Sequence, residues 1–112
     1  MKKVTLGAFE EMVLLAVGVL RDNAYGVTIK QELEENLKKK ISLGALYAAL
    51  QRLEEKGWVN SRVGGITEER GGRRKQYYDI TNDGVLALEE VRAMRNEMFN
   101  RIPEHKLDIL KP

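Results

Sequence analysis

The chain has 112 residues, of which 43% are hydrophobic, and it contains no cysteine. This length predicts one domain with one core, and the lack of thiols excludes disulfides, thiolate catalysis and most structural zinc sites. Nineteen basic residues against 17 acidic ones leave a net charge of only +2, so a surface that binds nucleic acid must be local. We expect a soluble, cytoplasmic protein, because the apolar run at 12–20 is too short to cross a bilayer.

The first predicted helix has Thr5 as a candidate N-cap and includes residues 12–20, where nearly every face is apolar. A helix without a polar face must be covered on more than one side. Because a small domain can hardly do this alone, we expect a second subunit to cover part of it. The interface residues predicted on this helix are Met12, Leu15 and Val19.

The second predicted helix spans about 27–37, with Ile29, Leu33 and Leu37 on one apolar stripe. Three lysines at 38–40 follow it. Cations are favoured at a helix C-terminus in any case, and secondary contacts with phosphate are the other interpretation of these lysines.

The third predicted helix spans 42–56, from Ser42 as N-cap to a stop at Gly57. The side predicted to face the core consists of Leu43, Leu46, Leu50 and Leu53. The other side carries mostly small residues, which would allow the helix to enter a DNA major groove about 12 Å wide. The alternative is that the alanines raise helix propensity and that Tyr47 fills the edge of the core.

Two side chains of this helix are suited to contact DNA bases. Glutamine pairs with adenine and arginine with guanine, so Gln51 and Arg52 are the candidates, while the Tyr47 hydroxyl can contact a phosphate. The predicted contact residues of the helix are Ser42, Gly44, Ala45, Tyr47, Ala48, Gln51 and Arg52.

Two strands are predicted at 58–63 and 76–80, joined by a long glycine-punctuated loop at 64–75. The loop carries four cations within six positions, and its glycines allow the backbone to approach phosphate. An isolated run of charge is usually only solvated. Beside a slim helix, however, it is better interpreted as a DNA-binding wing. The predicted contact residues of the wing are Arg70, Gly72, Arg73, Arg74 and Lys75.

The last predicted helix begins at Thr81 or Asn82 and extends to about Ile102, before Pro103. Apolar residues recur along it at heptad spacing, which is typical of a helix that packs against another helix. Its predicted interface residues are Val91, Met94, Met98 and Ile102. We expect a frayed tail at 103–112.

This order of elements predicts a mainly α fold with a small β-hairpin, of the α+β class. Residues 1–81 would form a winged helix-turn-helix region, and residues 82–102 would add a long dimerisation helix to the same domain. In a two-fold dimer the two third helices would lie about 34 Å apart, matching half-sites on one face of a duplex.

Three segments, "YGVTIKQELEE", "LGALYAALQRLEEKGWV" and "GGRRKQYYDITNDG", resemble the PadR-type winged-helix transcriptional regulators. The resemblance covers about residues 9–88 and is closest to the compact branch with a single carboxy-terminal helix. It implies a homodimer formed by the first and last helices, repression of nearby genes, and release by a small-molecule inducer or another signal. Tyr47 matches the recognition-helix tyrosine, and residues 72–75 match the wing.

The chain departs from the family pattern at two places. Ala48 stands where many members carry proline. The last helix offers Met94, Arg95 and Met98, and not the tryptophan with which some compact members stack flat ligands between subunits.

The predicted function is therefore a homodimeric, sequence-specific DNA-binding repressor that reads a palindromic operator with helix 42–56 and wing 64–75. We expect no enzyme, no cofactor and no metal site, because the single histidine, His105, lies in the tail and no phosphate-binding glycine loop opens a helix. Two alternatives remain open: a winged-helix module that docks another protein, and an RNA binder.

Overall fold

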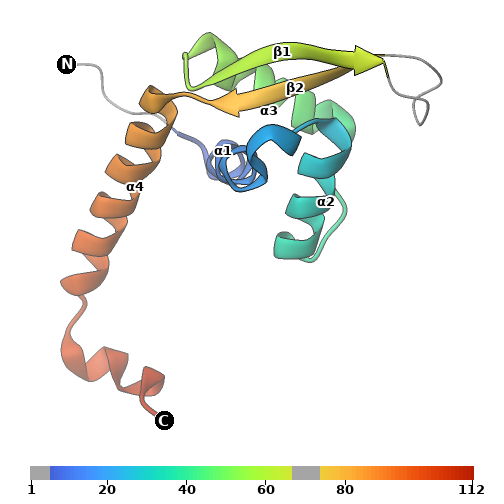
Figure 1. Ribbon diagram of the computed structural model, residues 1–112. Helices are drawn as coiled ribbons and strands as arrows, with labels where there is room; N and C mark the ends of the chain where they lie inside the picture. The colour runs from blue at the N-terminus through green and yellow to red at the C-terminus, as the bar shows by residue number, and fades with distance from the viewer. Residues whose placement is uncertain (1–5, 67–73) are drawn as a thin grey trace.

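The computed structural model describes residues 6–66 and 74–112. Along the chain it contains α1 (Ala8–Leu20), the 3-10 turn η1 (Arg21–Asn23), α2 (Gly26–Leu37), α3 (Leu43–Glu55), β1 (Val59–Ile66), β2 (Arg74–Ile80), α4 (Asn82–Asn100) and the 3-10 segment η3 (Glu104–Leu110). Figure 1 shows the hairpin lying across a body formed by α1, α2 and α3, whereas α4 leaves the end of β2 and runs away from that body. The predicted winged-helix arrangement of helices and one hairpin is confirmed.

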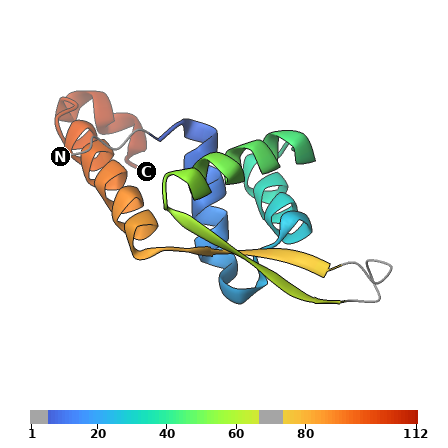
Figure 2. The same ribbon diagram turned by 90° about the horizontal axis from the view of Figure 1, so that it is seen from above.

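The core lies where α1, α2 and α3 meet beneath the hairpin, and Figure 2 shows α1 passing between the other elements. Each helix contributes one apolar stripe at helical spacing. The largest fully buried side chains are Leu14, Ile29, Leu33, Leu46, Leu50, Leu53, Val13, Val17 and Val59.

The hairpin is longer than the sequence predicted. Val59 lies opposite Ile80, and the register shifts after Val63, beyond which Ile66 lies opposite Arg74. This irregularity lets the two strands continue pairing past the point where the alternating pattern ends. The predicted ranges of 58–63 and 76–80 therefore extend to 59–66 and 74–80.

Two expectations about the starts of helices differ from the structure. Thr5 lies outside the described residues, and the residue that precedes α1 is Gly7, which has no side-chain cap. Leu43 was predicted to face the core but is 45% exposed. It lies on the same side of α3 as Leu50, so its exposure reflects its position as the first residue of the helix, beyond the reach of the core.

The tail that was predicted to fray contains a segment of regular local structure. The last helix ends at Asn100, and after Pro103 the chain forms η3. The Lys106 amide donates to the Pro103 carbonyl, and an ion pair joins Lys111 to Asp108 at 3.2 Å. These local bonds need no tertiary partner, which is why the segment can be regular while most of its side chains are exposed.

The start of α4 is fixed tightly to the hairpin. The Thr81 hydroxyl accepts a hydrogen bond from the Gly84 amide at 3.0 Å and donates one to the Gly57 carbonyl at 2.7 Å. A Cβ at Gly84 would collide with the Trp58 carbonyl oxygen and press on Ile80. The root of α4 thus requires glycine.

Beyond its root, α4 loses contact with the body. Gly84, Ala87 and Val91 are buried, and every residue from Arg92 to the end of the helix is exposed. The radius of gyration is 16.8 Å, against about 13 Å for a compact domain of this length. The protruding α4 accounts for this difference. None of the described helices is long and apolar enough to span a membrane.

We predict that Gly84→Ala lowers the free energy of unfolding by about 1–3 kcal/mol, because the methyl group overpacks the contact with the Trp58 carbonyl. Gly44→Ala is the matched control, since a Cβ there would meet nothing within 4 Å. It should leave stability unchanged or raise it by up to about 1 kcal/mol. Urea denaturation of both variants measures the difference, and equal stabilities would contradict this account of Gly84.

Candidate nucleic-acid interface

The outward face of α3 is defined here as Gly44, Ala48, Gln51 and Glu55, which recur every three or four residues and are all exposed. They lie opposite the buried Leu46, Ala49, Leu50 and Leu53. The helix begins at Ser42, whose hydroxyl accepts a hydrogen bond from the Ala45 amide at 3.1 Å. The leading half of this face thus carries no long side chain before Gln51.

Tyr47 lies on the side of α3 that faces α2. It is partly exposed, and its hydroxyl lies so close to Gly26, the first residue of α2, that a Cβ there would collide with it. Tyr47 therefore joins the two helices of the helix-turn-helix and remains 41% exposed.

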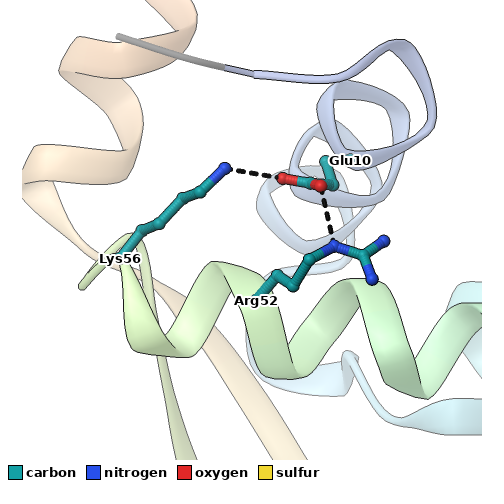
Figure 3. Close-up of polar contacts among 3 residues, drawn as sticks. All are labelled: Glu10, Arg52 and Lys56. Atoms are coloured by element: carbon teal, nitrogen blue, oxygen red, sulfur yellow. Dashed lines mark hydrogen bonds and ion pairs between the residues drawn. The ribbon is translucent and has the colours of Figure 1, made fainter. Parts of the chain in front are cut away.

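Arg52 is turned away from the outward face. Its Nε donates a hydrogen bond to Glu10 Oε2 at 2.8 Å, and Lys56 Nζ bonds Glu10 Oε1 at 2.9 Å (Figure 3). Arg52 was predicted to reach base edges; in this structure its side chain is bonded to Glu10 of α1, on the side of α3 that faces the first helix.

The Glu10 carboxylate is the best-shielded member of this cluster, with a side chain only 13% exposed. Burial by itself would raise the pKa of Glu10. The hydrogen bonds from Lys56 and Arg52, with their positive charges, outweigh that effect and lower the pKa below its usual value of 4.5. The carboxylate thus stays charged at neutral pH.

The tip of the hairpin, with Arg70, Gly72 and Arg73, lies outside the described residues. Arg74 begins β2. Lys75 was predicted as a DNA-contacting cation of the wing; it is only 7% exposed, and its Nζ lies 4.2 Å from the ring centroid of Tyr25. Lys75 lies in β2 on the same side of the strand as Tyr77, and both side chains pack against Tyr25, which accounts for the burial of Lys75.

An aromatic cluster supports the base of the hairpin. The rings of Tyr25 and Tyr77 meet edge to face at 5.4 Å, and the Arg62 guanidinium lies 4.7 Å from the Tyr77 centroid. The amide of Tyr78 donates to the carbonyl of Ala24 at 2.8 Å. These contacts join the hairpin to the segment just before α2, and so fix the wing relative to the helix-turn-helix.

The predicted interface residues of α1 and α4 fall into two groups. Val91 is buried within its own chain, because the first turns of α4 pack against the body. Met12 is partly buried. The exposed members are Leu15, Val19, Met94, Met98 and Ile102.

Sequence reasoning missed Glu10 and Tyr25. Glu10 bonds a residue 42 positions away, a separation that leaves no periodic signal. Tyr25 lies in a turn, where an aromatic residue ahead of a helix was the only available sign of its packing. Within residues 6–66 and 74–112, no group of three or more acidic or histidine side chains could hold a metal ion.

We predict that Glu10→Gln lowers the free energy of unfolding by about 1 kcal/mol at pH 7, the amount expected of half-exposed ion pairs. Because the pKa of Glu10 is lowered by folding, this stabilisation is present above pH 4.5 and is lost as pH falls through the lowered pKa. Urea denaturation from pH 7 to pH 3 should show the two proteins converging. The pKa of Glu34 is also lowered, mainly by a hydrogen bond from the Ile41 amide. Because Glu34 is present in both proteins, its contribution to the pH dependence cancels in the difference between them. A difference in the free energy of unfolding between the two proteins that stays constant with pH would contradict the assignment of this stabilisation to the Glu10 carboxylate.

Comparison with known proteins agrees with this geometry. A model of the transcriptional regulator PadR-like family matches residues 14–90. An uncharacterised protein of Lysinibacillus sphaericus is 37% identical over 75 residues, which are 65% of this chain and 66% of the relative. The match therefore spans just under two thirds of that relative's length.

Solved structures give the same result. The X-ray structure of a PadR-like transcription factor from Bacteroides fragilis matches with a TM-score of 0.71 and 26% identity, over 82% of this chain and 84% of the other. A PadR family transcriptional regulator from Eggerthella lenta matches with a TM-score of 0.65 and 28% identity, over 80% and 75%. This chain thus belongs to the PadR-like family of transcriptional regulators, whose members are DNA-binding proteins and not enzymes.

Proposed function

We propose that this chain is a homodimeric repressor that reads a palindromic operator, with α3 in the major groove and the wing on the adjacent backbone. The observation that carries the proposal is the slim outward face of α3, which lies beside a hairpin anchored to the same body. In this proposal residues 1–81 bind DNA and α4 joins the two subunits.

The outward face of α3 supports insertion into a groove. Gly44 and Ala48 present little more than backbone, and Gln51 follows them on the same line. A glutamine at this position can make two hydrogen bonds to adenine. We therefore assign base recognition to Gln51, and close backbone approach to Ser42, Gly44, Ala45 and Ala48.

The wing supplies the contacts that do not depend on sequence. Arg70, Arg73 and Arg74 are proposed to contact phosphate or the minor groove, with Gly72 allowing close approach. Lys75 is left out of this set because it is buried at the base of the hairpin.

The protruding part of α4 supports a dimer. Its exposed apolar residues are Met94, Met98 and Phe99, with Ile102 just beyond. Leu15 and Val19 expose a second apolar strip on α1. A two-fold interface that buries both strips would remove their apolar surface from water. It would also place the α3 helices at half-sites about 34 Å apart.

A hollow between α1 and α4 supports a small-molecule inducer at the dimer interface. It has a volume of about 370 Å³ and is lined by Glu11, Leu15, Val85, Leu88, Glu89, Arg92, Arg95 and Asn96, within the range of small-ligand pockets. Met12 lines a different hollow, between α1 and α2. The inducer is therefore assigned to the charged α1–α4 hollow and not to the methionines.

We predict that the double variant Arg73→Ala, Arg74→Ala weakens binding to duplex DNA of any sequence and reduces the slope of log K against log salt by about 1.8 units, because two phosphate contacts are lost. Fluorescence anisotropy across a salt series with a 24-base-pair duplex measures this.

Gln51→Ala is the contrasting variant. It should change the sequences selected from a random duplex library while leaving the salt slope unchanged. If the double arginine variant binds as tightly as the wild type, or if duplex RNA competes better than duplex DNA, the proposed mode of binding is wrong.

We predict that Met98→Glu shifts the protein from dimer to monomer, since a carboxylate would lie in an apolar helix interface. Val27→Glu is the matched control, because Val27 is similarly exposed but belongs to α2. Sedimentation equilibrium of the three proteins distinguishes the cases. A wild-type protein that is monomeric at high micromolar concentration would contradict the dimer.

A further inference from the structure

Glu10 connects the first helix to the recognition helix through two cations. One carboxylate oxygen accepts from Arg52 Nε at 2.8 Å, and the other bonds Lys56 Nζ at 2.9 Å. Figure 3 shows the side chains of Arg52 in α3 and of Lys56, the residue just after α3, extending toward the one carboxylate on α1. No other carboxylate described in the chain is bonded to two cations of α3.

The three groups differ in their access to solvent. Glu10 is 13% exposed, whereas the side chains of Arg52 and Lys56 are 50% and 33% exposed. The cations are therefore more accessible to an external anion than the carboxylate that holds them is to solvent. The lowered pKa of Glu10 keeps this carboxylate charged whenever the protein would meet DNA.

The position of the two cations matters because they border the outward face of α3. Arg52 follows Gln51 in the chain, and Lys56 lies one turn further on, beside the Trp58 ring at 5.1 Å. A helix in the major groove is flanked by phosphates. Cations on its border would bind those phosphates whatever the base sequence.

We propose that Glu10 is a specificity-determining positioning residue: it holds Arg52 and Lys56 in place of DNA phosphate and so suppresses binding that does not depend on sequence. This inference rests on the proposed DNA-binding function. Non-specific affinity comes almost entirely from phosphate contacts, and discrimination is the ratio of specific to non-specific binding. If Arg52 and Lys56 do not contact phosphate on any DNA sequence, a larger share of the binding affinity comes from Gln51 and the wing.

The first test compares the wild type with Glu10→Gln on a random-sequence 24-base-pair duplex by anisotropy. Glutamine keeps the shape and removes the charge, which releases Arg52 and Lys56 from the carboxylate. The salt slope should steepen by up to about 1.8 units, so that the affinity of the variant falls about 12-fold more than that of the wild type between 50 and 200 mM salt.

Glu97→Gln is the matched control. It removes the same charge, but the partner of Glu97 is Arg101, at 2.9 Å, and not a residue near α3. Its slope should stay at the wild-type value. Glu10→Asp restores a carboxylate and should return the slope toward that of the wild type. A role for Glu10 in folding alone would instead lower affinity without a change of slope, and that result would overturn the inference.

A second variant tests the inference without altering Glu10. If the carboxylate already withholds both cations, Arg52→Gln with Lys56→Gln should leave the wild-type salt slope unchanged, and adding Glu10→Gln to this pair should not steepen it. A loss of about 1.8 units in the pair would mean that both cations contact phosphate in the wild type, and the inference would be wrong. Failure of the wild type to bind duplex DNA at any salt concentration would instead overturn the proposed function itself.

Discussion

The burial of α1 is the constraint on which the rest of the structure depends. This helix packs against α2, α3, β2 and α4, and its side chains Val13, Leu14 and Val17 are almost completely buried. Each element with a proposed role in DNA binding or dimerisation is therefore placed by contact with one helix. Adjacent residues of that helix also bond two different neighbours, since Glu10 bonds α3 and Glu11 bonds α4. A small displacement of α1 would act on both at once.

The distribution of charge explains how a nearly neutral chain can belong to a family of DNA-binding regulators. Several cations near the site are occupied by the protein itself: Arg52 and Lys56 by Glu10, Arg62 by Asp79, and Lys75 by its burial against Tyr25. In the proposed complex the outward face of α3 therefore contributes mainly shape and Gln51, with the exposed lysines at 38–40 nearby. Such a surface would favour discrimination between sequences over affinity for any duplex.

The element order, the caps of α3 and α4, and the hairpin could be predicted because each is encoded by neighbouring residues. Ser42 and Thr81 cap their helices as polar N-cap residues should, and leucines at helical spacing mark the buried side of α3. Three features could not be predicted: the burial of Lys75, the burial of Val91, and the ion pair between Glu10 and Arg52. Each depends on which distant element lies opposite, and this leaves no pattern in the local sequence.

The glycine at the root of α4 has a consequence for how such a regulator could evolve. At Gly84 the helix lies against the carbonyl of Trp58 and the side chain of Ile80. The carbonyl is made of main-chain atoms, which substitution does not reshape, so it makes a fixed contribution to the angle at which α4 leaves the hairpin. In the proposed dimer that angle contributes to the separation of the two recognition helices. Operator spacing would then be inherited with the fold, and a lineage could change the bases it recognises at Gln51 without changing the distance between its half-sites.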